Sequence, residues 1–245
     1  MTQSPSMPAA TPGAKMMYLI KRRPAISRDE LVAHWFANHM PQVIDAQRQA
    51  AAAGRLHATR YIATLFKPLA DDSSPWDGVA QLHWDRALPK PKAPYGNPPT
   101  DSFQERAEPY WQWATTEYVV IDGQLPVAPL TLNAPFPTTR SGFCKATRIV
   151  TASPGVDHDA LFRHWLTVHA DNVAQTLRSV GGFRYVVSHS IAPQEEPYVG
   201  MSELYFPNDD ALAQFRASLK PDGIERYVDL SAPMLLSDTE MVGIP

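Results

Sequence analysis

The chain has 245 residues, of which 44% are hydrophobic and 19% charged, as in an ordinary globular protein. This length allows one large domain or two of about 100 to 120 residues, each with its own core. The net charge of −3 and the absence of a Lys/Arg block argue against a nucleic-acid partner. The longest apolar stretches fall short of the roughly 20 residues that a membrane span requires, so no membrane partner is expected.

Residues 1–13 are rich in Ser, Pro and Ala and lack a basic start followed by an apolar run. They are predicted to form a loose, disordered leader and not a signal peptide. The single cysteine, Cys144, excludes an internal disulfide and a cysteine-based zinc site, and it is typical of a small buried residue on a strand. Together these features favour a cytoplasmic location.

An internal repeat determines the domain organisation. Residues 15–43 align with residues 145–173 at a constant offset of 130 without a gap, with eight identities in twenty-nine positions. Those identities include Trp35/Trp165, His34/His164 and His39/His169. Later matches are Arg60-Tyr61/Arg184-Tyr185, Gly78/Gly200, Leu82/Leu204 and Thr116-Glu117/Thr239-Glu240. The whole unit is therefore duplicated, and not one helix alone.

Both copies predict the same elements in the same order. In the first copy these are a strand Lys15–Arg22, a helix from Ser27 to Gly54, strands His57–Phe66 and Val79–Trp84, a helix Ser102–Trp113 and a strand Glu117–Ile121. In the second they are a strand Phe143–Thr151, a helix from Asp157 to Gly181, strands Phe183–Ser190 and Gly200–Phe206, a helix Asn208–Leu219 and a strand Glu240–Ile244. Ser27 and Asp157 are good N-caps, and Gly54 and Gly181 suit helix ends.

This order predicts an α+β fold of two ferredoxin-like βαββαβ repeats, over residues 14–122 and 142–245. A proline-rich linker at residues 123–141 is expected to join them. Since helices cover one sheet face only, the two repeats are expected to pack sheet-to-sheet as a pseudo-dimeric α/β barrel. A homodimer of the whole chain is also compatible with this design. Residues 86–101 contain five prolines and are interpreted as an insertion in the first copy, either a lid or a surface loop.

Each repeat places one histidine on the apolar face of its first helix. On a regular helical wheel His39 and His169 lie among leucine, valine and aromatic positions, whereas His34 and His164 point away toward solvent. A single such histidine is usually a core residue with a satisfied hydrogen bond. Burial would nevertheless lower the pKa of its imidazole and keep it neutral near pH 7, as a general base requires. A catalytic role for His39, His169 or both is therefore an open alternative to a core role.

Other chemistry-bearing residues are fewer. Tyr61 and Tyr185 occupy equivalent second-strand positions, where a hydroxyl could orient a substrate oxygen or simply pack. No nucleotide-binding, nucleophile-elbow or paired-cysteine motif is present. Histidines five residues apart lie about 140° apart on a regular α-helix, so His34 and His39 are not expected to share a metal. No metal and no cofactor are expected.

The motif Lys21-Arg22-Arg23-Pro24 followed by His34-Trp35-x3-His39-Met40-Pro41 resembles the EthD family of dimeric α/β-barrel proteins. The resemblance covers residues 14–122 and 142–244. In the second copy Ala170-Asp171 replaces Met40-Pro41, so we expect the second copy to contribute less activity.

The resemblance implies a pocket in each repeat with His39 or His169 at its wall. Trp35, Trp165, Tyr61 and Tyr185, which are expected beside these histidines, are the candidate substrate-binding residues. The wider superfamily includes polyketide cyclases, muconolactone isomerases, cofactor-independent monooxygenases and haem-dependent enzymes. The expected function is a cofactor-independent isomerase, cyclase, dehydratase or other lyase acting on a hydrophobic, carbonyl- or phenol-bearing small molecule. Two alternatives stay open: a cofactor-free monooxygenase of an aromatic substrate, and a non-catalytic binding module.

Overall fold

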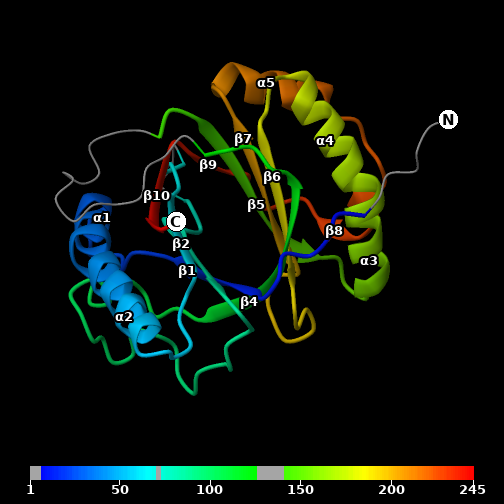
Figure 1. The fold of residues 1–245 in the computed structure, drawn as a ribbon. Coiled ribbons are helices and arrows are strands. Elements are labelled where there is room, and N and C mark those ends of the chain that lie inside the picture. The colour runs from blue at the N-terminus through cyan, green and yellow to red at the C-terminus, as the bar shows by residue number, and fades with distance from the viewer. Residues whose placement is uncertain (1–6, 70–72, 126–140) are drawn as a thin grey trace. The chain divides into compact units, whose positions relative to one another are not determined.

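A computed structural model describes residues 7–69, 73–125 and 141–245. The described chain divides into two compact units (Figure 1). The first-repeat unit contains the described residues of 13–114, 126–141 and 237–245. The second-repeat unit contains those of 7–12, 115–125 and 142–236. Most of the linker expected at residues 123–141 lies outside the described residues.

The first-repeat unit has one antiparallel sheet with strand order β10-β2-β3-β1. Its strands are β1 (Ala14–Ile20), β2 (Arg60–Leu65), β3 (Gly78–Trp84) and β10 (Thr239–Ile244). Its helical segments are α1 (Arg28–His34), the π-helix η1 (Trp35–His39) and α2 (Met40–Ala52). These three segments form one continuous rod against one face of the sheet (Figure 1).

The second-repeat unit has the strand order β4-β6-β7-β5-β8, with β9 also pairing with β5. Its strands are β4 (Gln112–Ile121), which begins in the other unit, β5 (Cys144–Ala152), β6 (Arg184–Ser190), β7 (Gly200–Phe206), β8 (Val228–Asp229) and β9 (Leu235–Ser237). Its helices are α3 (His158–His164), the π-helix η2 (Trp165–His169), α4 (Ala170–Ser179), α5 (Asp209–Ser218) and the 3-10 turn η3 (Ile224–Arg226). The expected α+β class is confirmed by this mixture of helices and antiparallel strands.

Local sequence explains where the first helix of each repeat begins and ends. The Ser27 hydroxyl accepts the Glu30 amide, and the Asp157 carboxylate accepts the amides of Asp159 and Ala160, so both predicted N-caps are confirmed. Beyond the helix ends Gly54 and Gly181 have positive φ values of 63° and 77°, as the predicted glycine stops require.

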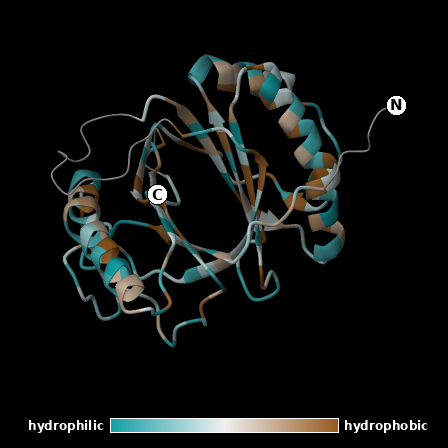
Figure 2. Ribbon diagram, in the orientation of Figure 1, coloured by the Kyte–Doolittle hydropathy of each residue, from teal (hydrophilic) through white to brown (hydrophobic). Residues whose placement is uncertain are grey.

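The core of each unit lies between its helices and one face of its sheet. In Figure 2 the hydrophobic colour is confined to part of each helix, as expected for amphipathic helices. On strand β7 Leu204 and Phe206 belong to this core, because residues two apart on a strand lie on the same face. Trp165 packs on β7 at Gly200, where a Cβ atom would lie 3.0 Å from the indole ring. The same contact joins Trp35 to Gly78, so the repeated glycines make room for the repeated tryptophans.

The last strand of each repeat differs from the expectation that it closes its own sheet. Strand β10, at the end of the second repeat, pairs with β2, and β4, at the end of the first repeat, pairs with β6. The two copies present equivalent second strands, so each last strand can pair with the other copy at the same kind of edge. The N-terminal segment also takes part, since Ala10 forms a bridge with Tyr118. This part of the leader, expected to be loose, is therefore paired.

The helix predicted over Ser102–Trp113 is wrong. Residues 102–106 form turns, and the chain then extends into β4. Pro109, which lacks an amide hydrogen and has a fixed φ, limits the space for a helix between Asp101 and the strand.

The proline-rich segment is also not an insertion. Sixteen residues (85–100) join β3 to Asp101 in the first repeat. In the second repeat fifteen residues (207–221), which include α5, join β7 to Asp222. The five prolines of the first-repeat segment remove backbone donors that a helix needs, so an irregular segment replaces the second helix of the first repeat.

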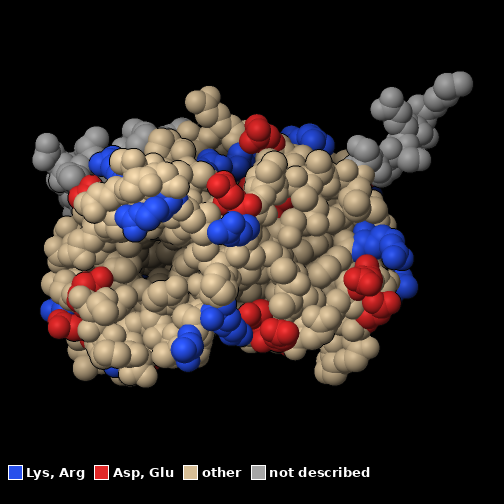
Figure 3. All heavy atoms as spheres, turned by 60° about the horizontal axis from the view of Figure 1, so that its bottom comes forward, with Lys and Arg blue, Asp and Glu red and all other residues tan. Residues whose placement is uncertain are grey.

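No helix within the described ranges is both long and apolar enough to span a membrane. On the face shown in Figure 3, acidic and basic side chains are interspersed, and no extended patch of one sign forms. This distribution agrees with the near-neutral net charge of −3.

Candidate functional site

Both repeats pair the predicted histidine with a carboxylate that lies far along the chain. In the first repeat His39 Nδ1 lies 2.6 Å from Asp101 Oδ2, and in the second His169 Nδ1 lies 2.8 Å from Asp222 Oδ2. The imidazoles are partly buried, with side-chain exposures of 16% and 19%. A histidine–aspartate pair thus occurs twice at equivalent positions.

A π-helical turn sets the direction of these histidines. Residues Trp35–His39 and Trp165–His169 form π-helices, which are rare and are often found at functional sites. The wider turn brings residues five apart onto one side of the helix. His164 Nε2 consequently lies 3.9 Å from Asp222 Oδ1, and His34 Nδ1 lies 2.9 Å from the Ser102 hydroxyl. The prediction that His34 and His164 point to solvent is wrong, because a regular wheel does not describe a π-helix.

Asp222 is held in place by several donors. Asn172 Nδ2 donates to Oδ2 at 2.7 Å, and the Ile224 amide donates to Oδ1 at 3.1 Å. Burial alone would raise the pKa of Asp222, but the hydrogen bonds from Asn172 and His169 and the nearby His169 charge hold it below the usual range. Asp222 is therefore ionised near pH 7 and accepts a hydrogen bond from Nδ1–H of His169.

Burial lowers the pKa of His169. The Asp222 carboxylate opposes this shift, while His164 and Arg148 add to it. A neutral imidazole with its proton on Nδ1 leaves the lone pair on Nε2, which is the form that a general base needs.

A cavity of about 470 Å³ lies beside His169, inside the second-repeat unit. Its walls are mostly apolar, and they include Val150, Trp165, Val173, Leu204, Phe215, Ile224, Val228 and Met234. The polar lining consists of Arg148, His169, Tyr185, Ser202, Lys220, Asp222 and Glu225. A mostly apolar hollow with a few convergent polar groups is typical of a small-molecule site.

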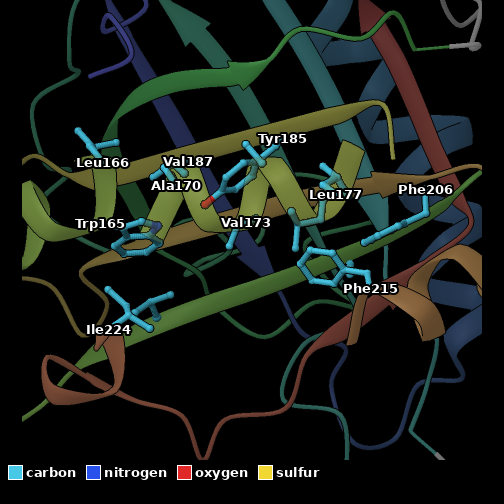
Figure 4. Close-up of a cluster of buried hydrophobic side chains, with 14 of the residues drawn as sticks. Trp165, Leu166, Ala170, Val173, Leu177, Tyr185, Val187, Phe206, Phe215 and Ile224 are labelled. Carbon is cyan, nitrogen blue, oxygen red and sulfur yellow. The ribbon is translucent and has the colours of Figure 1, made fainter. Parts of the chain in front are cut away.

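Tyr185 and Trp165 bring two further polar groups to this cavity. Both residues are buried, and among the described residues neither the Tyr185 hydroxyl nor Trp165 Nε1 has a hydrogen-bond partner. In Figure 4 the Tyr185 oxygen points toward Trp165. Burial raises the pKa of Tyr185, a shift that the Trp165 N–H only partly opposes, so the hydroxyl stays protonated. In the first repeat, by contrast, Trp35 Nε1 donates to the Tyr61 hydroxyl at 3.3 Å.

Aromatic side chains lie close to the equivalent histidine of the first repeat. The Phe103 ring lies 4.5 Å from the His39 imidazole, between ring centroids. Tyr95, from the proline-rich segment, stacks on Tyr110 at 5.7 Å, and both rings contact Tyr18. Rings therefore pack close to His39, at the place where the sequence predicted a pocket equivalent to the one at His169.

The sequence reasoning did not identify Asp101 and Asp222. A weak signal existed, because Asp101-x-Phe103 and Asp222-x-Ile224 match at an offset of 121, close to the offset of 122 found for Gly78 and Gly200. Arg148 carried no comparable signal, because Tyr18 aligns with it at the offset of 130. Among the described residues no group of three or more His, Cys, Asp or Glu is arranged to bind a metal ion.

His189, on the same unit, is a buried histidine outside the cavity. Its imidazole stacks on Phe162 with centroids 4.2 Å apart, and its Nε2 has no hydrogen-bond partner among the described residues. Burial lowers the pKa of His189 to about 3. Because the unfolded state has the higher pKa, it binds more protons than the folded state between about pH 3 and 6.5, and stability falls as the pH falls through this window.

His189→Gln is therefore expected to reduce the acid sensitivity of the protein. Between pH 7 and pH 4 the wild type should lose about 3 kcal/mol more free energy of unfolding than the variant. Urea unfolding of both proteins at the two pH values measures this difference. His57→Gln, at an exposed hydrogen bond, is the matched control and should retain the wild-type pH dependence. Equal pH dependence of the wild type and His189→Gln would show that folding does not change the pKa of His189, which contradicts the expected shift.

A family model described as the EthD domain matches residues 153–231. The family resemblance indicated by the sequence is thereby confirmed in the second repeat. No curated protein matches the sequence.

The fold is also similar to solved structures. A variant of chlorite dismutase from Candidatus Nitrospira defluvii is 10% identical, with 92% of this chain and 90% of that chain covered at a TM-score of 0.49. A heme-binding protein from Thermus thermophilus is 12% identical, with coverages of 97% and 94% and a TM-score of 0.42.

Proposed function

Because residues 153–231 match the EthD domain, we propose that the second-repeat unit is a small-molecule enzyme that moves a proton at a carbon next to a carbonyl group. The observation that carries this proposal is the His169–Asp222 pair, 2.8 Å apart, at the wall of an apolar cavity. A neutral imidazole in this setting can remove a proton through Nε2. The reaction class is isomerisation, cyclisation, dehydration or a related lyase step.

Asp222 acts in this proposal as the positioning group. Its carboxylate fixes the tautomer and the orientation of His169, and it stabilises the imidazolium that forms when the proton is taken up. The hydrogen bond from Asn172 fixes the Asp222 carboxylate, so the His169–Asp222 pair does not need to reorganise during proton transfer. This arrangement uses only side chains of the second-repeat unit.

The oxygen of the substrate would bind near Tyr185 and Trp165. When a base removes the proton, negative charge develops on the carbonyl oxygen, and preorganised donors stabilise it. The protonated Tyr185 hydroxyl is a donor with no hydrogen-bond partner among the described residues, and the Trp165 N–H, which also lacks one at normal distance, lies near the Tyr185 oxygen. Leaving such buried groups unpaired costs about 1–3 kcal/mol each, so a ligand oxygen that accepts from them would bind favourably.

Exchange of α-protons for deuterium tests the proposal without knowledge of the natural substrate. A panel of cyclic and aromatic ketones, with 2-tetralone as the first member, is incubated with the protein in D₂O and followed by proton NMR. Exchange faster than the buffer-catalysed rate supports the proposal. Saturable binding of these ketones with exchange at the buffer rate would instead identify a binding module.

Because side chains supply the proton transfer, the proposed reaction needs no cofactor. The purified protein is therefore expected to show no Soret band, and elemental analysis should find no stoichiometric metal. A haem bound at one site per chain, with exchange activity that depends on it, would contradict a cofactor-independent reaction and would favour oxidative chemistry.

A further inference from the structure

Cationic side chains gather at one part of the second-repeat cavity. Arg148, on β5, and Lys220, which follows α5, both line the cavity. Arg216, in the last turn of α5, lies close enough to contribute to a lowered pKa of Arg148, after the larger effect of burial. Two guanidinium groups and an ammonium group thus lie on or beside an otherwise apolar cavity, in a protein whose net charge is −3.

The two arginines have no carboxylate partner among the described residues. Arg148 donates to the backbone oxygens of Leu230, at 3.4 Å, and Ala232, at 3.2 Å. Arg216 donates to the sulfur of Met234 at 3.5 Å. These neutral acceptors orient the guanidinium groups but do not compensate their charge. Arg148 is partly buried while Arg216 is exposed, and like charges held close together raise the free energy unless an anion binds there.

The acidic residues of the cavity are already engaged. Asp222 accepts hydrogen bonds from His169, Asn172 and the backbone. Glu225 accepts the Gly223 amide at 3.1 Å. The lining therefore offers positive charge to a ligand, whereas its negative charge is directed at the protein itself.

We propose that the ligand of this cavity is a carboxylate: a ring compound whose anionic group binds Arg148 and whose ring packs on the apolar wall. This inference rests on the proposed function, since it names the substrate class of the same site. A guanidinium group matches a carboxylate with two parallel hydrogen bonds, which gives both orientation and affinity. The reactive carbon would then face His169, while the carboxylate stays at the arginine end.

The first repeat provides an internal comparison. At the offset of 130, Tyr18 occupies the position of Arg148. Tyr18 contacts the rings of Tyr95 and Tyr110, at centroid distances of 5.7 and 6.2 Å. The position that carries the cation in the second repeat is thus part of an aromatic cluster in the first. Anion binding is accordingly assigned to the second repeat.

Two matched ligands test the inference by isothermal titration calorimetry of the full chain. 2-Naphthoate carries a carboxylate, and 2-acetonaphthone has a similar shape with a neutral methyl ketone. A charge-assisted hydrogen bond predicts about 10- to 100-fold tighter binding of the naphthoate. Arg148→Gln should abolish this preference and leave the affinity for the ketone within about 2-fold of the wild type. Arg148→Lys should keep part of the preference for naphthoate, because it retains the positive charge. Arg178→Gln, on the exposed side of α4, is the control and should bind both ligands as the wild type does.

The outcomes separate this inference from the proposed function. Equal affinity for both ligands, or an equal loss of both in Arg148→Gln, overturns the carboxylate assignment and leaves the His169 chemistry intact. A retained preference for naphthoate in a protein without α-proton exchange supports the anion site and overturns the proposed reaction. If neither ligand binds the wild type, the cavity is not a binding site, and both inferences fail.

Discussion

Replacement of His169 by Gln is expected to lower the rate of α-proton exchange by roughly 10²–10⁴-fold, the usual contribution of a positioned acid or base. Glutamine keeps a polar side chain of similar length but has no basic nitrogen. The free energy of unfolding should fall by only about 1 kcal/mol, because the side chain is 19% exposed and its removal leaves one hydrogen bond unmade. Exchange rates from NMR and urea unfolding of the same preparations provide the two measurements.

His39→Gln is the matched control, because it breaks the equivalent pair with Asp101 in the first repeat. The sequence favoured a larger contribution from His39, since Met40-Pro41 follows it as in the family motif. The structure favours the opposite, because a cavity lies beside His169 whereas the Phe103 ring packs close to His39. Exchange by His39→Gln is therefore expected to stay within about 2-fold of wild type, a change too small for the loss of an acid or base. If His39→Gln loses exchange and His169→Gln does not, the proposed site is in the wrong repeat.

The sequence alone predicted the features that depend on local chemistry. Two copies with eight aligned identities established the duplication, and Ser27 and Asp157 marked the helix starts by their capping side chains. Gly54 and Gly181 marked the helix ends, and both have the positive φ that such an end uses. These features depend on residues that are close in sequence, so spacing and side-chain type are sufficient to find them.

The site required information that spacing does not contain. The regular wheel assumed 3.6 residues per turn, and the π-helix at Trp165–His169 changes that number where the histidines lie. The partner of His169 is Asp222, fifty-three residues away and on a turn, where one aspartate looks like any other. Only the fold brings these two residues together. The alignment of the repeats was the one route by which Asp101 and Asp222 could have been found.

The proline-rich segment shows a different limit. It was interpreted as an insertion because its composition has no match in the second repeat, although its length matches the α5 region. Sequence comparison detects similar residues. Here the two repeats have connecting segments of similar length but different secondary structure, an irregular segment in the first and α5 in the second. This replacement brings Tyr95 against Tyr110 and Tyr18 in the first repeat. The second repeat has Arg148 and a cavity in the corresponding region.

Trp165→Ala is expected to reduce the free energy of unfolding of the second-repeat unit by about 3–5 kcal/mol. Trp165 is 2% exposed and its indole ring packs on the backbone at Gly200, so its removal leaves a buried space next to the sheet. For a domain of about 100 residues this loss should lower the melting temperature by roughly 12–30 °C. Calorimetry resolves the effect if the two units unfold separately, because only one of the transitions should move.

Trp111→Ala makes the same substitution at a tryptophan that is 44% exposed, and it should change the free energy of unfolding by less than about 1 kcal/mol. The contrast between the two variants therefore measures burial and not the loss of an indole as such. A cost below about 1 kcal/mol for Trp165→Ala would mean that the ring does not support the core. In that case the cavity wall next to His169 would lack a rigid support, and the geometry of the His169–Asp222 pair could not be maintained by packing. A cost in the expected range for Trp165→Ala, together with a loss of only about 1 kcal/mol in His169→Gln, separates the residue that supports the site from the residue that performs its chemistry.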